Sequence, residues 1–245
     1  MSEIMQIVDR SQTLTPFHEL GAKNFAFATG EAVAAWIDVT AVQWTDFSDY
    51  WNALTLDRHM ADGGTYRLRR YGAFTLQRPD EMRLLPHAPY VQALYINPLN
   101  GGVSRVFDPL EEGFSQHVVL SRLLNRIADL VDAIDGRAQR WNIKLHPYRI
   151  LAQQGSAGLP TPEGLHRDGV DYIVTMLVKR GNIAGGETLV TDADKQPLWR
   201  RTLSTPMDLV IANDHSTMHA VTPVTPIVED VEAYRDVLIV AFRKE

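Results

Sequence analysis

A histidine and an aspartate lie two positions apart in the segment TPEGLHRDGVDY, residues 161–172. Residues i and i+2 of an extended chain point to the same side, so the imidazole of His166 and the carboxylate of Asp168 can converge on one cation. A third ligand must come from elsewhere, and His219 in the later segment DHSTMHAVTP is the best candidate. Two histidines and one carboxylate on one face of an octahedron leave three positions open, an arrangement typical of non-haem Fe(II) oxygenases.

Two other histidines compete for the third position. His215 lies four residues before His219 and would share its side only in a helix, which the serine, threonine and proline nearby do not favour. We interpret His215 as a loop residue or as one that supports the ligand side chains without binding the metal. His146 lies within an apolar segment and is expected to pack or hydrogen-bond there, so His219 is preferred over both.

Two apparent nucleotide motifs do not fit their usual contexts. His166-Arg167-Asp168 spells the catalytic triplet of protein kinases, but the sequence has no glycine-rich phosphate loop and no Asp-Phe-Gly at a suitable position. The segment GNIAGG, residues 181–186, opens no predicted helix and is better explained as a connection between two strands.

Composition excludes several other classes of protein and site. The 245 residues are 45% hydrophobic and 22% charged, which is ordinary globular usage. With a net charge of −6, the chain lacks the excess of basic residues that is typical of a nucleic-acid-binding protein. The absence of cysteine excludes disulfides, thiolate metal sites and a cysteine nucleophile. No stretch is long and apolar enough to span a bilayer, and no secretory signal begins the chain, so we expect a cytoplasmic protein with neither nucleic-acid nor membrane partners.

The periodicity of the chain predicts a mainly β fold with flanking helices. Apolar residues at spacings of three and four predict a helix that Ser115 caps and Gly136 ends. Short alternating segments separated by turn residues indicate an antiparallel sandwich or barrel. The predicted strands are 65–77 with a break near Gly72, 90–96, 142–151, 170–179, 187–191, 197–203, 209–212, 218–222 and 234–242.

No segment has the character of a linker between domains. We therefore expect one domain over residues 1–245, in which about 1–64 form a helical or irregular cover. Residues from about 65 to 245 then supply further helices and the β core.

Six segments carry a resemblance to a known family. They are RRYGAF, QALYINPLNGGVSRVFDPL, PEGLHRDGVDY, NIAGGET, HAVTPV and YRDVLIVAF, and they cover most of the chain from Arg69 to Phe242. Together they resemble the bacterial 2-oxoglutarate- and Fe(II)-dependent dioxygenases that hydroxylate free amino acids, typified by L-isoleucine 4-hydroxylase. A biofilm stress and motility protein belongs to the same group. The first sixty residues match poorly.

The resemblance implies a double-stranded β-helix, the cupin-like jelly roll, with a metal at one open end. It implies Fe(II) held by His166, Asp168 and His219, with 2-oxoglutarate and O2 as cosubstrates. In the wider superfamily an arginine that starts the last core strand pairs with the distal carboxylate of 2-oxoglutarate, and Arg235 matches that place. A serine often follows two residues later, whereas this chain has Val237, so one hydrogen bond to the cosubstrate is absent or replaced.

Arginine is chemically suited to this role because a planar guanidinium binds a carboxylate with two parallel hydrogen bonds. The alternative for Arg235 is an exposed cation that balances Glu232 or Asp236. Arg243 also brackets the last strand, but it lies at a solvated terminus and is the weaker candidate.

The resemblance further implies a small-molecule substrate, a free L-amino acid, whose aliphatic C–H is hydroxylated or whose sulfur is oxidised while succinate and CO2 are released. Its carboxylate and ammonium need protein partners, for which Arg105, Arg149, Arg167 and Asp171 are candidates by their proximity to the matching segments. A homodimer is compatible with the sequence.

Two alternatives of different classes are a regulatory jelly-roll protein without turnover, linked to biofilm or stress responses, and a metal-dependent hydrolase or isomerase on a cupin-like barrel. In the second of these Arg235 would have no role.

Overall fold

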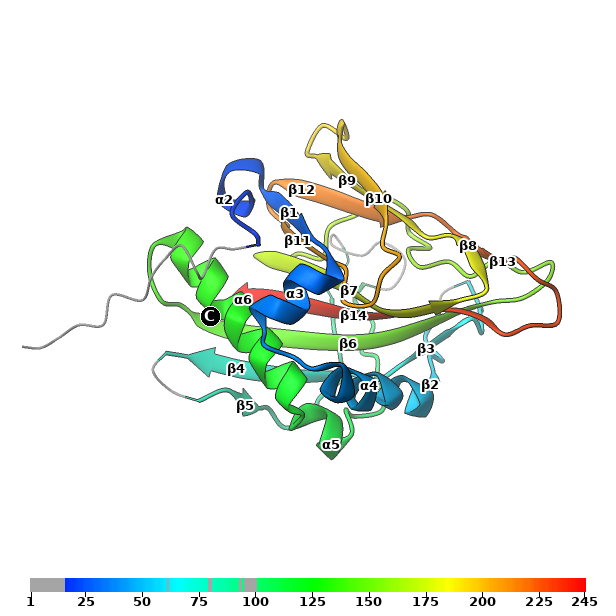
Figure 1. Cartoon of the computed structure of the whole chain (residues 1–245), viewed down its shortest axis with the longest axis horizontal. Helices are drawn as coiled ribbons and strands as arrows, with labels where there is room; N and C mark the ends of the chain where they lie inside the picture. The colour runs from blue at the N-terminus through cyan, green and yellow to red at the C-terminus, as the bar shows by residue number, and fades with distance from the viewer. Residues whose placement is uncertain (1–15, 61, 79–80, 93, 95–100) are drawn as a thin grey trace, which may run out of the picture.

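The computed structural model describes residues 16–60, 62–78, 81–92, 94 and 101–245, and its helices lie against one face of a large sheet (Figure 1). The helical segments are α2 (Leu20–Lys23), α3 (Gly30–Trp36), α4 (Ala41–Asp49), the 3-10 helix η1 (Tyr50–Ala53), α5 (Glu112–Ser115) and α6 (Val118–Asp135). The strands are β1 (Phe25–Ala28), β2 (Thr55–Leu56), β3 (Arg67–Arg69), β4 (Gly72–Gln77), β5 (Arg83–Leu84), β6 (Arg140–Ala152), β7 (Tyr172–Gly181), β8 (Ile183–Gly185), β9 (Glu187–Asp192), β10 (Pro197–Thr202), β11 (Leu209–Asn213), β12 (Thr217–Val221), β13 (Val224–Pro226) and β14 (Ala233–Lys244).

The large sheet has the order β1-β11-β7-β14-β6-β3-β2, with β4 and β5 attached through β6. Its pairings are antiparallel. Two smaller sheets, β10-β9-β12 and β13-β8, complete the double-stranded β-helix. The predicted mainly β, jelly-roll fold is confirmed.

Strand alternation gives each central strand two environments. In β14, Leu238, Val240 and Phe242 join the core beneath the helices, whereas Val237 and Ala241 join a second apolar cluster on the opposite face. Because side chains alternate with a period of two, one strand packs against the helices and lines an interior at the same time. The polar residues of that interior form the candidate site.

The long helix α6 supplies most of the apolar layer behind the sheet. Leu120, Leu123 and Ile127 are fully buried at the spacing the sequence predicted. Gly136, at a φ of 76°, ends the helix as expected. The prediction of Ser115 as its cap is wrong. Ser115 closes the separate short helix α5 with a hydrogen bond to Glu112 O, and the ring of His117, the residue before α6, accepts the N–H of Val119 instead.

The N-terminal part of the chain contributes a strand that the sequence analysis did not predict. β1 pairs with β11 at the edge of the large sheet. Nearby, α4 begins with a capping box in which Thr40 and Gln43 exchange side-chain and backbone hydrogen bonds. Trp51 in η1 donates its indole N–H to the backbone oxygens of Tyr148 and Val237 at 3.1 and 3.3 Å, which ties this segment to the central strands.

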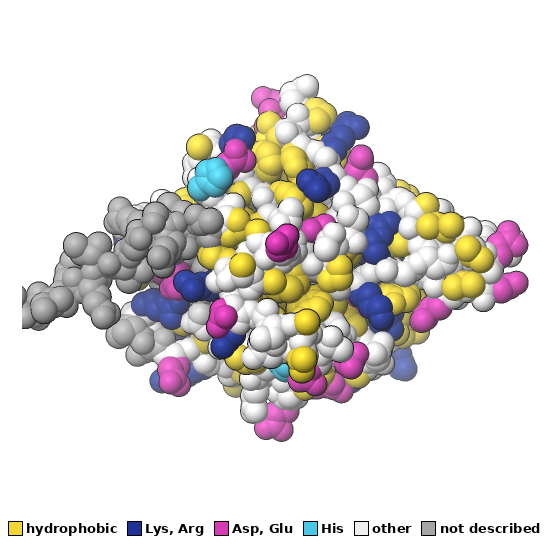
Figure 2. Space-filling view, viewed as in Figure 1, with side chains coloured by type: hydrophobic (Ala, Val, Ile, Leu, Met, Phe, Trp, Pro, Cys, Tyr) yellow, Lys and Arg dark blue, Asp and Glu magenta, His cyan; other side chains and the backbone are white. Residues whose placement is uncertain are grey.

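Seven predicted strands in the second half agree with observed strands to within about two residues at each end. The prediction of a strand over 90–96 lies partly outside the described residues. Within them, Tyr90 forms a single antiparallel bridge with Arg105. No helix among the described residues combines the length and hydropathy needed to cross a membrane. On the face shown in Figure 2, basic and acidic side chains are interspersed around apolar surface.

Candidate active site

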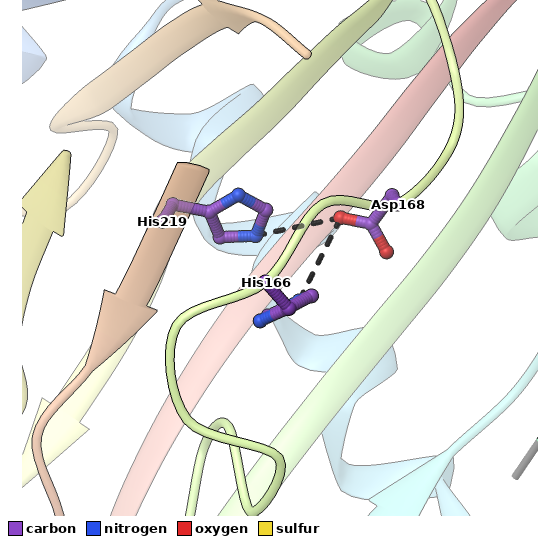
Figure 3. Close-up of side chains that lie close together, drawn as sticks. All are labelled: His166, Asp168 and His219. Atoms are coloured by element: carbon purple, nitrogen blue, oxygen red, sulfur yellow. Dashed lines mark ion pairs between the residues drawn. The ribbon is translucent and has the colours of Figure 1, made fainter. Parts of the chain in front are cut away.

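Three side chains that the sequence analysis singled out as metal ligands converge in space. Nε2 of His219 lies 3.4 Å from Oδ2 of Asp168, and Nε2 of His166 lies 3.9 Å from the same oxygen. Their potential ligand atoms all fall within 4.8 Å of one another. Figure 3 shows the three side chains pointing toward one another, His219 from β12 and the other two from the loop before β7. The spacing and the N/O donor set fit one divalent cation.

Backbone pairing sets the relative position of the two histidines. His166 and His219 form an isolated antiparallel bridge with both N–H···O distances at 3.0 Å. Nδ1 of His166 lies 2.9 Å from the backbone oxygen of Gly164. That contact assigns the proton to Nδ1 and leaves the Nε2 lone pair directed at the cluster, as ligand histidines require.

The loop that carries Asp168 is held by a buried carboxylate that the sequence analysis missed. Asp214 accepts hydrogen bonds from the backbone N–H groups of Asp168, Gly169 and Val170 at 3.1, 2.7 and 3.1 Å. Since Asp214 is 2% exposed, it fixes the backbone behind the metal ligands without facing the pocket. An aspartate before a turn gives no separate signal in the sequence.

Burial and mutual charge shift the ionisation of the cluster. Burial, with a smaller effect of His166, lowers the pKa of His219 to about 3. Burial also lowers the pKa of His166, but the carboxylates of Asp168 and Glu163 outweigh it, so the net direction is upward. Burial raises the pKa of Asp168. A divalent cation at this point favours neutral imidazoles and an ionised carboxylate, because it repels protons and attracts negative charge.

The competing histidines lie elsewhere, as the sequence analysis expected. His215 is 69% exposed and its Nε2 contacts Oδ1 of Asp171 at 3.1 Å, on the surface. His146 is buried on β6, where its ring stacks on Tyr71 and Tyr148 and its Nδ1 contacts the guanidinium of Arg69. Neither belongs to the cluster of possible ligands.

A pocket of about 810 Å³, partly open to solvent, extends from the cluster into the interior of the β-helix. Antiparallel register brings its walls together, because Arg235 pairs with Ile150 of β6 and Ile150 pairs with Arg67 of β3. The pocket is lined by four arginines and the carboxylates of Glu163 and Asp168, with Tyr90, Tyr148, Thr175, Val237 and Ile239 among its other walls.

Arg235 is a buried cation that no described acidic side chain pairs with in this pocket. It is 1% exposed, and among the described residues neither Nε nor Nη2 has a hydrogen-bond partner. Burial, with a contribution from nearby Arg180, lowers the pKa of Arg235 to about 10, so the group stays charged at neutral pH. The alternative of an exposed strand-start cation is wrong. Asp236 faces the other way and pairs with Arg149. A buried guanidinium without a partner calls for an anion, and a carboxylate fits it in shape and charge.

The double glycine of the segment NIAGGET makes room for this arginine. Gly185 and Gly186 adopt φ angles of 78° and 75°, which favour glycine. A Cβ on Gly185 would collide with the backbone oxygen of Pro223, and one on Gly186 would lie 3.4 Å from Cδ of Arg235. The connection between β8 and β9 therefore depends on glycine for its backbone conformation, and at Gly185 also for its close approach to Pro223, where it passes beside Arg235.

Of the four residues expected to contact substrate, only Arg105 lines the pocket. Arg149 lies on the opposite face of the sheet, where Nε and Nη2 donate to the carboxylate of Asp236 at 2.8 and 2.7 Å. Arg167 donates to the backbone oxygen of Thr217 at 3.1 Å.

The fourth candidate, Asp171, pairs with His215 and Lys244. The contacts of Asp171, Arg149 and Arg167 therefore lie away from the pocket. Proximity in sequence to the metal motif was therefore a poor guide, because neighbouring strand residues point to opposite faces.

The sequence analysis also missed two pocket residues in the first half of the chain. Arg67 and Arg69 of β3 are 8% and 2% exposed and line the same pocket. Arg67 forms a buried ion pair with Asp57 at 2.7 Å. The only signal for Arg69 was the resemblance of RRYGAF to the family, which gave no role to any single residue, and Arg67 lies outside that segment.

Comparisons with known proteins show the family and the fold of the chain. The sequence profile of the 2OG-Fe dioxygenase family matches residues 48–241. The chain is 28% identical over 181 residues to 3(1)-hydroxy-L-isoleucine 4-dioxygenase of Pantoea ananatis, which covers 73% of each protein. A BsmA homologue from Methylobium petroleophilum PM1 is 34% identical, with a TM-score of 0.86 over 96% of this chain and 93% of that one.

The crystal structure of IDO from Bacillus thuringiensis shares the fold at 20% identity, with a TM-score of 0.78 over 96% of this chain and 99% of that one. The donor set of the cluster fits Fe(II), and the unpaired guanidinium fits a carboxylate of 2-oxoglutarate. The family profile covers more than half of the sequence, and the chain therefore belongs to the 2OG-Fe dioxygenases, non-haem iron enzymes that use Fe(II), 2-oxoglutarate and O2.

Proposed function

We propose that this dioxygenase hydroxylates an aliphatic C–H bond, or oxidises a sulfur atom, of a small free amino acid and releases succinate and CO2. The observation that carries the proposal is the combination, in one pocket, of a His-Asp-His cluster with an unpaired buried arginine. The similarity to an enzyme whose name gives 3(1)-hydroxy-L-isoleucine as its substrate supports the choice of an amino acid.

In this proposal Fe(II) is bound by Nε2 of His166, Nε2 of His219 and the carboxylate of Asp168. When bound, it supplies the reactivity toward O2 that no protein side chain has. The hydrogen bond from Nδ1 of His166 to Gly164 and the three that Asp214 accepts hold the ligands in place before the metal arrives.

Arg235 binds the distal carboxylate of 2-oxoglutarate at the far end of the pocket from the substrate. Its fully buried position makes a charge-assisted hydrogen bond strong, because water does not compete for the guanidinium. Val237 and Ile239, on the same side of β14, give the pocket apolar walls. These walls exclude water from the reacting groups.

The position of the pocket supports a small substrate. It lies inside the β-helix, is only partly open to solvent, and combines apolar walls with a few charged side chains. A concave site of this kind suits a small molecule better than a folded partner.

The proposal is tested with a panel of free amino acids in the presence of Fe(II), 2-oxoglutarate and ascorbate. Succinate formation and the mass of each amino acid are followed together. We expect at least one small aliphatic or sulfur-containing amino acid to stimulate succinate formation and to gain one oxygen atom. A chelator should stop both, and added Fe(II) should restore them. Stimulation by a peptide or a lipid, with none by any amino acid, would refute the substrate class.

A further inference from the structure

Two buried arginines besides Arg235 line the pocket with hydrogen-bond donors that no described residue accepts. Arg69 and Arg105 are 2% and 3% exposed, and Nε of each has no partner within the part of the chain that the structure describes. Nη2 of Arg105 donates to the neutral side-chain oxygen of Gln92 at 2.8 Å. Buried guanidinium groups with spare donors are costly unless an anion joins them, because they have lost their contact with water.

The carboxylate of Asp57 does not balance these cations. Asp57 is committed to Arg67, whose Nε and Nη2 lie 2.8 and 2.7 Å from its Oδ2, and it reaches Arg69 only at 3.7 Å. His146 beside them carries no compensating negative charge. Burial and the surrounding cations, Arg69 first, hold the pKa of His146 well below its usual range. This side of the pocket therefore has an excess of positive charge.

Aromatic rings hold the two guanidinium groups in place. Arg69 lies 3.6 Å from the ring centroid of Phe107, and Arg105 lies 4.9 Å from that of Tyr90. Each arginine also lies 5.8 Å from the other's ring. The rings of Phe107 and Tyr90 contact both guanidinium groups and keep them close together despite their repulsion, and these cation–π contacts restrict the rotation of the guanidinium groups. Because the two groups are already ordered, binding a carboxylate costs less conformational entropy.

This cluster is separate from Arg235. Arg69 pairs with Tyr148 of β6, which pairs with Val237 of β14, so Arg69 and Arg235 stand two strands and two residues apart. Strand spacing places their Cα atoms roughly 12 Å from each other. A pocket with cations in two separate places can hold two anions at once.

We propose that Arg69 and Arg105 together bind the carboxylate of the substrate, while Arg235 binds that of 2-oxoglutarate. The inference rests on the proposed function and makes it more specific, since it explains why the substrate is a free acid rather than an amine or amide. The metal ligands line the same pocket, so a substrate held at its carboxylate presents its aliphatic part to the iron.

The test uses full-length enzyme with Fe(II) and compares Arg69→Met and Arg105→Met with Arg201→Met. The last is a matched control, because Arg201 also lies over an aromatic ring, 4.4 Å from the Phe27 centroid, but on β10 and exposed. Probes are L-isoleucine, L-isoleucinamide and 2-methylbutylamine, which differ in the carboxylate. Binding to the anaerobic complex with 2-oxoglutarate is measured by calorimetry, and KM values are measured for both L-isoleucine and 2-oxoglutarate.

We expect the wild type and Arg201→Met to bind L-isoleucine far more tightly than the amide or the amine. Arg105→Met and Arg69→Met should each lose about 30-fold or more in affinity for L-isoleucine. Their KM for 2-oxoglutarate should stay within about twofold, which also shows that the variants are folded and loaded with iron. Arg105→Lys should recover part of the loss, because it restores the charge without the paired donors.

Three results would overturn the inference. Unchanged affinity for L-isoleucine in both variants removes the role of the cluster, and a raised KM for 2-oxoglutarate alone assigns the cluster to the cosubstrate. Equal binding of amine and acid by the wild type shows that no carboxylate is recognised. If no amino acid in the panel stimulates succinate formation by the wild type, the proposed function itself fails. That failure is distinguishable because it is observed with the wild-type enzyme alone, without any variant.

Discussion

His215 and His219 lie four residues apart, yet only His219 faces the pocket. β12 begins between them at Thr217, so the backbone is extended where a helix would have placed both on one side. Pairing of β12 with β9 and the bridge to His166 then fix the direction of His219. The choice of His219 as the proposed third ligand thus follows from where a strand starts, which the nearby turn residues already suggested.

The ligand assignment predicts different effects when His215 and His219 are replaced in turn. His219→Ala should abolish Fe(II) binding and succinate formation, because two remaining ligands hold the metal weakly. His215→Ala should keep most of both, since it removes only a surface contact with Asp171. Iron content after anaerobic loading, with circular dichroism to check the fold, measures the difference. Loss of iron in His215→Ala with retention in His219→Ala would reverse the assignment.

The unpaired guanidinium of Arg235 predicts a specific defect in cosubstrate binding. Arg235→Ala should weaken 2-oxoglutarate binding by about 2–5 kcal/mol, the usual cost of leaving one partner of a buried charge pair alone. Arg243→Ala is the control at the other end of β14, where the side chain is exposed. It should change 2-oxoglutarate binding little. The 2-oxoglutarate concentration dependence of succinate formation decides between them. An unchanged dependence in Arg235→Ala would transfer the role to Arg69 and Arg105.

At the scale of elements, the loop before β7 depends on a carboxylate from the end of β11. Asp214 stops three backbone N–H groups from remaining unsatisfied and so positions Asp168. It does not touch the metal, and its effect on the site is indirect.

Because Asp214 holds this loop, we expect Asp214→Asn to lower the affinity for iron by about 10–100-fold while the sheet stays folded. Asp208→Asn is a closely matched control. Asp208 is equally buried and also accepts three backbone hydrogen bonds, from Gly30, Ser204 and Thr205, but away from the metal. Both variants should lose comparable stability in urea, and only Asp214→Asn should lose iron. Equal iron affinity in the two variants would show that Asp214 has no positioning role.

The strands of the second half were predictable because each carries a clear alternation bounded by turn residues. β1, β8 and β13 were not, since they have only three or four residues and are defined by their partners β11 and each other. The convergence of His166, Asp168 and His219 was predictable from spacing and resemblance. Arg69 and Asp214 were not, because their roles arise from contacts across distant strands.

At the scale of the whole molecule, one sheet separates a supporting layer from a reactive one. Leu123 of α6 is fully buried against the back of the sheet, whereas β14 presents Arg235 to the pocket on the front. Stability and chemistry therefore reside on opposite faces of the same strands.

This separation predicts that core damage behind the sheet affects stability more than chemistry. Leu123→Ala should lower the free energy of unfolding by about 2–5 kcal/mol, because it leaves a cavity in a packed core. Val42→Ala, at a position 79% exposed on α4, should change it by about 0.5 kcal/mol or less. Urea denaturation measures both. At low temperature, Leu123→Ala should retain the wild-type KM for 2-oxoglutarate, and a large rise would show that the two layers are coupled.

The central claim is that oxidation of 2-oxoglutarate is coupled to oxygenation of a free amino acid in this pocket. The most direct measurement is turnover under 18O2 with the amino acid that best stimulates succinate formation. The account predicts one heavy oxygen atom in succinate and one in the amino acid product, in equal amounts, with neither formed by His166→Ala. Labelled succinate without a labelled amino acid would contradict it, as would a product whose new oxygen comes from water.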